Sequence, residues 1–282
     1  MIKFGPAGNS ASFYAEGHTK STETPEWLKN RGLDCFEYSL GRGINIGGET
    51  AAEIGREAAK CGIEMSVHAP YFINFANPES FEKSFGYIVG SLNVLKSLGG
   101  TRLVFHVGSQ QKQTREDALK NTLYALSKAA DKLKTDYPEF DGCKLCPETM
   151  GKIGQIGSVD EIIEICKTDD IFVPCIDFGH VNAREHGILK DGGGYAEILS
   201  KYLGELGERA VRMHVHFSKI EYSAGGEVRH LTFADNIYGP YFEHLAPLLI
   251  QNRMQPYIIC ESDGTQAEDA AEMKGYYLGL IG

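Results

Sequence analysis

The chain has 282 residues, 42% of them hydrophobic and 23% charged, which is the balance of an ordinary globular protein. Its formal net charge of -10 disfavours nucleic acid as a partner unless a local basic groove is present, because phosphate binding needs positive charge. No apolar run is long enough to span a membrane, and the amino terminus lacks the layout of a secretion signal. The number of cysteines, seven, is odd, which does not suit a disulfide framework. We therefore expect a cytoplasmic protein with reduced cysteines and no membrane contact.

Short apolar runs alternate with longer amphipathic ones along the chain. Helical spacing appears in segments such as 49–62 and 115–134. Strand–helix alternation without a Pro- or Ser-rich linker predicts a single (β/α)₈ TIM barrel spanning residues 1–282. An open doubly wound sheet is the competing fold, but the chain lacks the glycine fingerprint that follows its first strand. The eight strand candidates are residues 2–8, 35–41, 64–71, 102–109, 144–151, 172–180, 211–218 and 257–264.

The carboxyl ends of six consecutive strand candidates carry histidine or carboxylate side chains. In a barrel these ends form one rim, and that rim holds the functional site. Buried charges converging there would be unpaired without metal ions. The residues are His68, His106, Glu148, Asp177 with His180, His214 with His216, and Glu261.

The mixture of imidazole and carboxylate groups indicates the kind of metal. Imidazole suits zinc, with Mn²⁺ or Fe²⁺ as alternatives, whereas a site made only of oxygen ligands suits Mg²⁺ or Ca²⁺. The set is too large for one tetrahedral ion. We therefore expect two or three Zn²⁺ ions that share a bridging carboxylate. The CxxC at residues 143–146 has no second pair and is read as two core cysteines.

With these residues identified, the chain resembles the endonuclease IV family nearly end to end. That family consists of zinc-dependent apurinic/apyrimidinic endonucleases with a (β/α)₈ fold. The resemblance rests on HAPYFINFA at 68–76, FHVGS at 105–109, PETMGK at 147–152, CIDFGH at 175–180, HVHFSK at 214–219 and CESDG at 260–264. It implies that Glu148 bridges two ions and that His214, not His216, is a ligand. The remaining ligands that it implies are His68, His106, Asp177, His180, His230 and Glu261.

One position departs from the family pattern. The family completes its third zinc site with an Asp-Arg-His run, and this chain reads GGEVRH at residues 225–230. Arg229 and His230 fit that pattern, but Val228 stands where the Asp belongs. Glu227, one residue earlier, could reach the site if the loop shifts.

The resemblance implies hydrolysis of the phosphodiester on the 5′ side of an abasic site in double-stranded DNA, with Glu148 as the catalytic bridging residue. Two-metal sites activate water and polarise phosphate for such a displacement. Tyr71 and Phe72 would be apolar wedges in the minor groove, and Arg42 would also contact the DNA. Packing of the two aromatic rings beneath a loop is the competing interpretation. Nothing in the sequence implies a protein partner.

A second interpretation is a sugar isomerase or epimerase of the xylose-isomerase-like barrels. Such an enzyme needs one divalent ion, held by Glu148, Asp177, His214 and Glu261. It leaves four further imidazoles unexplained, those of His68, His106, His180 and His230. A metal-binding barrel without catalytic activity is a third interpretation, and it would need no aromatic side chains at the rim.

Overall fold

Eight parallel strands form the centre of the computed structural model, which describes residues 1–190 and 192–282. Each strand lies within one of the eight predicted runs and is shorter than that run, because the run continues into a loop at the carboxyl end of the strand. The strands are β1 (Lys3–Pro6), β2 (Cys35–Ser39), β3 (Glu64–His68), β4 (Arg102–Phe105), β5 (Lys144–Pro147), β6 (Cys175–Asp177), β7 (His214–Phe217) and β10 (Tyr257–Cys260).

The strands pair as two parallel sheets, in the orders β1-β10-β7-β6 and β2-β3-β4-β5. Two parallel bridges join the sheets, between Ala7 and Glu37 and between Glu148 and Cys175. The Gly8 amide donates to the Glu37 carbonyl at 3.0 Å, and the Thr149 amide donates to the Cys175 carbonyl at 3.0 Å. These contacts close the ring, so the predicted (β/α)₈ barrel is confirmed.

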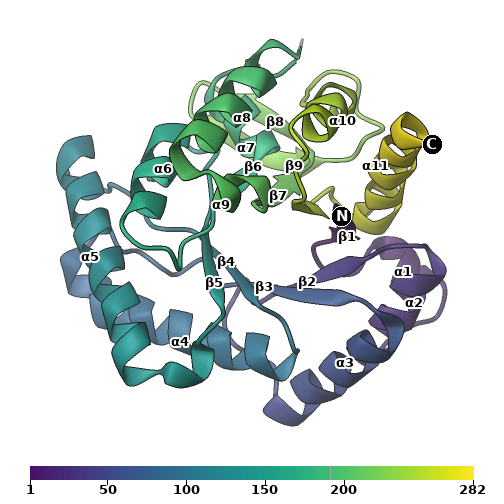
Figure 1. Cartoon of the computed structure of the whole chain (residues 1–282), viewed down its shortest axis with the longest axis horizontal. Coiled ribbons are helices and arrows are strands. Elements are labelled where there is room, and N and C mark those ends of the chain that lie inside the picture. Colours follow the sequence, from purple (N-terminus) through teal and green to yellow (C-terminus); the bar gives the residue numbers. More distant parts are fainter. Residues whose placement is uncertain (191) are drawn as a thin grey trace.

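The longer helices lie outside the strands (Figure 1). Their starts follow from local chemistry: Thr114 accepts from the Asp117 amide, and Ser158 and Glu161 form a capping box. The outer helices are α2 (Thr24–Asn30), α3 (Gly48–Cys61), α4 (Phe81–Ser97), α5 (Arg115–Asp136), α6 (Val159–Lys167), α8 (Gly193–Leu206), α10 (Phe242–Gln251) and α11 (Gln266–Ile281). Shorter pieces are α1 (Ala11–Ala15), α7 (Phe178–Arg184), α9 (Glu208–Val211) and three 3₁₀ turns, Ser21–Glu23, Pro78–Ser80 and Pro138–Phe140. None of the helices in the described residues has the length and apolar character needed to cross a bilayer.

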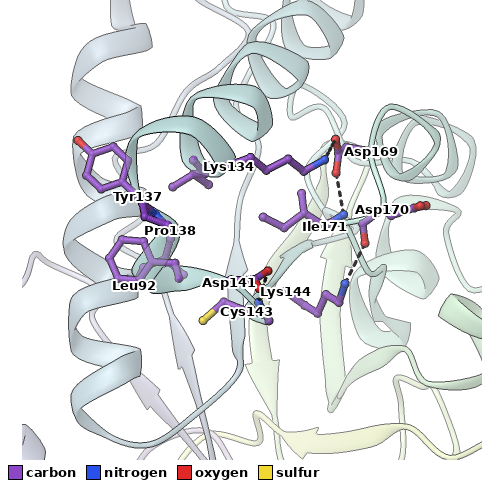
Figure 2. Close-up of a pocket in the computed structure, with 13 residues that line it drawn as sticks. Leu92, Lys134, Tyr137, Pro138, Asp141, Cys143, Lys144, Asp169, Asp170 and Ile171 are labelled. Atoms are coloured by element: carbon purple, nitrogen blue, oxygen red, sulfur yellow. Dashed lines mark hydrogen bonds and ion pairs between the residues drawn. The ribbon is translucent and has the colours of Figure 1, made fainter.

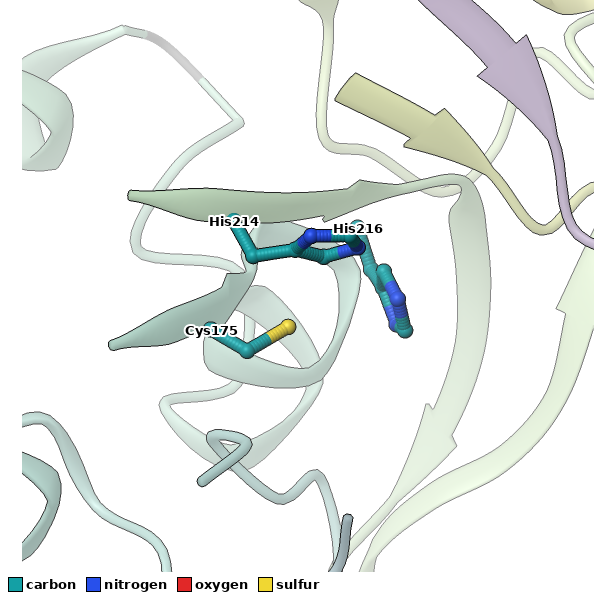
Figure 3. Close-up of side chains that lie close together, drawn as sticks. All are labelled: Cys175, His214 and His216. Atoms are coloured by element: carbon teal, nitrogen blue, oxygen red, sulfur yellow. The ribbon is translucent and has the colours of Figure 1, made fainter. Parts of the chain in front are cut away.

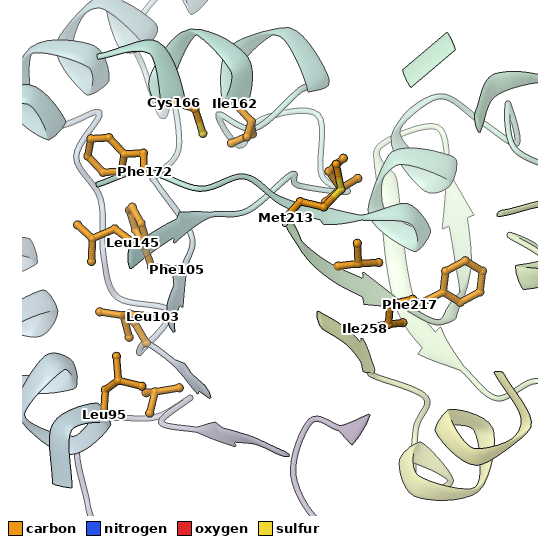
Figure 4. Close-up of a cluster of buried hydrophobic side chains, with 14 of the residues drawn as sticks. Leu95, Leu103, Phe105, Leu145, Ile162, Cys166, Phe172, Met213, Phe217 and Ile258 are labelled. Carbon is orange, nitrogen blue, oxygen red and sulfur yellow. The ribbon is translucent and has the colours of Figure 1, made fainter. Parts of the chain in front are cut away.

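The hydrophobic core fills the layer between the strands and the helices. Leu103, Phe105, Leu145 and Phe172 are at most 1% exposed and pack there (Figure 4). The barrel interior near the rim has a different character, because it holds buried charged and imidazole groups instead of aliphatic ones alone. The interior of this fold is usually filled by branched aliphatic side chains. In this chain it holds ionisable groups instead, and their burial costs free energy of folding unless they are paired.

A β-hairpin that was not predicted from the sequence follows β7. It consists of β8 (Lys219–Ser223) and β9 (Gly226–Leu231), which pair antiparallel. Gly226 has a φ of 90°, and a Cβ atom there would lie 2.1 Å from the Gly151 carbonyl oxygen. Only glycine permits this close approach, which holds the hairpin against the loop after β5.

Among several cavities in the described structure, two lie at opposite ends of the barrel. The larger, about 380 Å³, lies at the amino ends of β5 and β6 (Figure 2). Its polar groups are satisfied within the protein: Lys134 pairs with Asp169, and Lys144 donates to the Asp170 carbonyl at 3.2 Å. The smaller, about 240 Å³, lies at the carboxyl rim and is lined by histidine and carboxylate groups. The chemistry therefore belongs to the smaller cavity.

Candidate metal centre

Glu148 lies at the centre of the rim, directly after β5, and is fully buried. Its Oε2 atom lies 3.0 Å from His68 Nε2 and 3.1 Å from His106 Nε2. Its Oε1 atom lies 3.3 Å from His180 Nδ1 and 3.1 Å from His216 Nδ1. Four imidazoles from four different strands or their loops thus surround one carboxylate, with two on each oxygen.

His68, His106 and Glu148 form the first group whose ligand atoms are close enough to hold one ion. The two imidazole rings meet edge to face with centroids 5.0 Å apart. His68 Nδ1 donates to the Ala69 carbonyl at 2.9 Å, which leaves Nε2 directed at the group. A backbone acceptor on the outer nitrogen is the usual device that fixes the orientation of a metal-binding histidine.

Glu148, Asp177, His216 and Glu261 form a second group. Asp177 ends β6 and caps α7, where its Oδ1 accepts from the His180 amide at 2.7 Å. Its Oδ2 atom is buried, has no hydrogen-bond partner in the described structure, and lies 3.4 Å from His180 Nδ1. A buried carboxylate oxygen that accepts no hydrogen bond is costly, and a divalent cation would satisfy it. The second group therefore fits a divalent ion.

His180, Glu227 and His230 form a third group. His180 Nδ1 donates to the Thr149 carbonyl at 2.9 Å, and its Nε2 lies 3.4 Å from Glu227 Oε2. Val228 belongs to none of these groups, and half of its surface is exposed. In the endonuclease IV pattern the acidic residue of this site stands at position 228. In this chain the hairpin brings Glu227, one residue earlier, into the group with His180 and His230. Glu227, which the sequence offered as a substitute, therefore lies beside His180 and His230.

His214, the predicted ligand on β7, lies outside the three groups described above, although its ligand atom is close to those of Cys175 and His216. His214 begins β7, lies deeper in the barrel, and its Nε2 is 3.0 Å from Glu37 Oε2. Burial lowers the pKa of its imidazole to about 4. Two residues further along β7, His216 reaches both Glu148 and Glu261, with its Nδ1 3.4 Å from Glu261 Oε2. Seven of the eight predicted ligands thus lie in the three groups at the rim, and His216 takes part in the second group, where the motif had favoured His214.

The charges at the rim are strongly coupled. Burial lowers the pKa of His68, but the hydrogen bond and charge of Glu148 outweigh it and raise the pKa to about 9. Burial raises the pKa of Glu261, and the charge of His216 outweighs it and lowers the pKa to about 2. Burial raises the pKa of Asp177 to about 6. In the metal-free protein, the positive charge of protonated imidazoles such as His68 therefore offsets the negative charge of carboxylates such as Glu261.

The affinity of this centre for a divalent ion is expected to rise with pH. The His68 proton, held up to a pKa of about 9, must leave before Nε2 can bind an ion. Between pH 7 and pH 9 this proton alone raises the apparent affinity by about tenfold per pH unit. Calorimetric titration with zinc in two buffers of different ionisation enthalpy measures the proton release. Binding that releases no proton at pH 7 would contradict the ligand assignment.

The third ion is expected to depend on Glu227. Glu227→Ala leaves two histidines for that ion, fewer than the three or four protein ligands of a stable zinc site. The variant should lose one ion at a chelator concentration that leaves three ions on the wild type. Val228→Ala, which removes an exposed side chain one position away, is the matched control. Equal ion counts in wild type and Glu227→Ala at every chelator concentration would show that Glu227 binds no ion.

The side chains predicted to contact DNA lie around this centre. Tyr71 lines the rim cavity and is 56% exposed, and Phe72 is 42% exposed. Their rings are 4.3 Å apart, and Phe72 also stacks on Tyr87. They therefore do not pack beneath a loop. Arg42 is exposed in the loop after β2, beside Ser39 and Gly41, which line the cavity.

Two residues near the centre were not singled out from the sequence. Glu37 is buried in the middle of β2 and contacts both histidines of β7. A carboxylate within an otherwise apolar strand is the signal that could have identified it. Lys152 lines the rim cavity and has no ion-pair partner in the described structure. It is the last residue of the PETMGK segment, four residues after Glu148.

The model of the family described as "Xylose isomerase-like TIM barrel" matches residues 25–275. An uncharacterized protein of Methanocaldococcus jannaschii is 32% identical over 279 residues, which are 98% of this chain and 97% of that protein. A protein of Oceanobacillus iheyensis named "Probable endonuclease 4" is 29% identical over 186 residues, 62% of this chain and 60% of that protein.

Solved structures of two functional classes share the fold. A D-tagatose 3-epimerase-like protein superimposes with a TM-score of 0.73 at 18% identity, covering 99% of this chain and 98% of its own. Endonuclease IV from Thermus thermophilus superimposes with a TM-score of 0.64 at 19% identity, with the same coverage. At these identities the likeness establishes the fold and does not choose between the two activities.

Proposed function

Because the chain belongs to the xylose isomerase-like TIM barrel family, whose members include both endonucleases and sugar epimerases, we propose from its rim that it is a metal-dependent apurinic/apyrimidinic endonuclease. In this proposal it hydrolyses the phosphodiester 5′ to an abasic site in double-stranded DNA. The observation that carries the proposal is the third ligand group, His180, Glu227 and His230, which adjoins the groups around Glu148.

A sugar isomerase or epimerase with one divalent ion is the alternative. Glu148, Asp177, His216 and Glu261 suffice for that ion. This alternative gives no role to the other imidazoles at the rim, those of His68, His106, His180 and His230. His180 is buried, and burying an imidazole beside a site that needs one ion would be costly without a further use for it.

The three ligand groups suit phosphodiester hydrolysis. Divalent ions held by these residues would supply an activated water and positive charge to offset that on the phosphate and the leaving oxygen. Glu148 would contribute one oxygen to the group with His68 and His106 and the other to the group with His216. The chain thereby supplies a fixed spacing between ligand groups, which orients a phosphate before reaction.

The remaining rim residues would select the substrate. Lys152 gives the cavity a positive charge that a phosphate oxygen can approach, on a protein whose net charge is -10. Tyr71 and Phe72 present an exposed apolar edge beside the cavity. An abasic nucleotide unstacks at lower cost than an intact one, so aromatic wedges beside an ionic cavity favour damaged duplex.

Removing the two aromatic rings is expected to weaken binding to abasic duplex. A variant with Tyr71→Ala and Phe72→Ala should lose about 5- to 150-fold in affinity for each stacking contact that forms, since such contacts contribute about 1–3 kcal/mol. Zinc content should stay at the wild-type value because neither residue is in a ligand group. Tyr124→Ala, an exposed tyrosine on α5, is the control. Fluorescence anisotropy with labelled duplex measures the change, and unaltered affinity would contradict the wedge role.

The number of bound ions distinguishes the two functions. Protein purified without added metal and then dialysed against zinc should hold three ions per chain, measured by plasma mass spectrometry. A His180→Ala variant should hold two. A single ion in the wild type, retained in His180→Ala, would favour the epimerase alternative.

A further inference from the structure

A carboxylate lies inside the barrel beneath the rim and outside the three ligand groups. Glu37, in the middle of β2, has no exposed surface. Its Oε1 lies 2.9 Å from His216 Nε2, and its Oε2 lies 3.0 Å from His214 Nε2. Ser66, the residue paired with Glu37 on β3, donates its hydroxyl to Oε2 at 2.9 Å. Glu37 therefore spans the interior from β2 to β7.

The histidines that it contacts lie on the same side of β7, facing Cys175 on the neighbouring β6 (Figure 3). His214 and His216 are both fully buried, and their rings are 5.3 Å apart. Glu37 does not line the rim cavity, so a substrate bound there would not touch it. A buried carboxylate that meets no substrate costs stability, and packed aliphatic side chains would often serve the fold better.

We propose that Glu37 is a positioning residue for the metal centre. Its Oε1 forms an ion pair with His216 Nε2, and this contact keeps Nδ1 of the same ring directed toward Glu148 and Glu261. This inference rests on the proposed metal centre. His216 Nε2 faces Glu37. The other ring nitrogen, Nδ1, lies 3.1 Å from Glu148 Oε1 and 3.4 Å from Glu261 Oε2. The ring cannot rotate without breaking the contact with Glu37.

The partner of His216 differs in kind from those of the other rim histidines. His68 donates to the Ala69 carbonyl, His180 donates to the Thr149 carbonyl, and His230 Nδ1 lies 2.8 Å from the Ser218 hydroxyl. Those partners are neutral, whereas Glu37 is a carboxylate. A carboxylate on the outer nitrogen both fixes the ring and makes the inner nitrogen a stronger ligand. His216 is thus the histidine whose metal affinity depends most on its outer partner.

The test is the affinity for zinc of the full-length chain, measured by competition with a chromophoric chelator. Glu37→Gln keeps the shape of the side chain but removes its charge, and we expect a loss of about 10- to 100-fold for one ion. Asp34→Asn is the matched control: Asp34 directly precedes β2, at its amino end, where it accepts from the Phe4 amide and pairs with Lys274. Its affinity for zinc should equal that of the wild type.

A second variant guards against misfolding of the first. Glu37→Asp keeps the charge that the buried histidines need but withdraws the oxygens by one carbon–carbon bond, out of reach of His216. We expect it to fold, as followed by circular dichroism, and to lose affinity for one ion as Glu37→Gln does.

Wild-type affinity in either folded variant would overturn the positioning role. Equal losses in Asp34→Asn would also overturn it, because they would reflect a general effect of removing a charge. Wild-type protein that binds no zinc would overturn the proposed function itself, and this outcome is distinguishable from the first two because it appears before any residue is changed.

Discussion

Glu148→Gln is expected to abolish metal-dependent incision of abasic DNA while leaving the barrel folded. Each carboxylate oxygen faces two imidazoles, and an amide offers only one oxygen in place of two. The variant should therefore lose the link between the first and second ligand groups. Since a bound ion contributes several kcal/mol of charge stabilisation in the transition state, and each 1.36 kcal/mol is tenfold in rate, we expect a loss of about a thousandfold.

The matched control is Glu164→Gln on α6, an exposed carboxylate paired with Lys167. It makes the same chemical change away from the rim and should cleave at the wild-type rate. Single-turnover rates on a duplex with one abasic site, compared with the melting temperatures of both variants, separate loss of chemistry from loss of fold. A rate within a few-fold of the wild type in Glu148→Gln would show that Glu148 does not bridge ions.

Removing the metal is expected to cost both activity and stability. Any ion that binds only the folded protein stabilises it by about 2.7 kcal/mol at a concentration one hundred times its dissociation constant. For a chain of this size each kcal/mol corresponds to about 2–4 °C in the midpoint of thermal unfolding. Chelation should therefore lower that midpoint by at least several degrees, and zinc should restore it.

The readout of this prediction is a thermal unfolding curve with and without chelator at pH 7. Asp177→Asn should show a smaller shift, because one ligand of the second group is weakened before the chelator is added. The same midpoint with and without chelator in the wild type, together with unchanged incision, would mean that the rim groups hold no ion.

The strands and their order could be predicted from the sequence because the barrel depends on local patterns. Each strand is a short apolar run, and each helix has apolar spacing of three or four residues. The rim could be predicted for the same reason, since residues such as His68 and Glu148 follow their strands directly. What the pattern could not place is anything set by long-range packing.

His214 and His216 illustrate this limit. In a strand, residues two apart point the same way, so the alternation of side chains does not say which of the two reaches the rim. The family motif favoured His214, whereas β7 begins at that residue and places it deeper in the interior. His216, nearer the carboxyl end of the strand, is the one in contact with Glu148.

Glu227 is a second residue whose position depends on long-range packing. The sequence offered it only as a substitute for an acidic residue missing at the next position. Its placement depends on a hairpin held against the loop after β5 by the close contact of Gly226 with Gly151. That contact joins segments about 75 residues apart, and no local periodicity records it.

The most direct test of the proposed function is incision of a 5′-labelled duplex that carries a single abasic analogue, with the products resolved on a sequencing gel. We predict one cut, immediately 5′ to the abasic position and leaving a 3′-hydroxyl end, by zinc-loaded protein. The cut should disappear with chelator and should not occur in an intact duplex of the same sequence. An uncut duplex, with zinc-loaded protein that instead interconverts ketose epimers, would contradict the account.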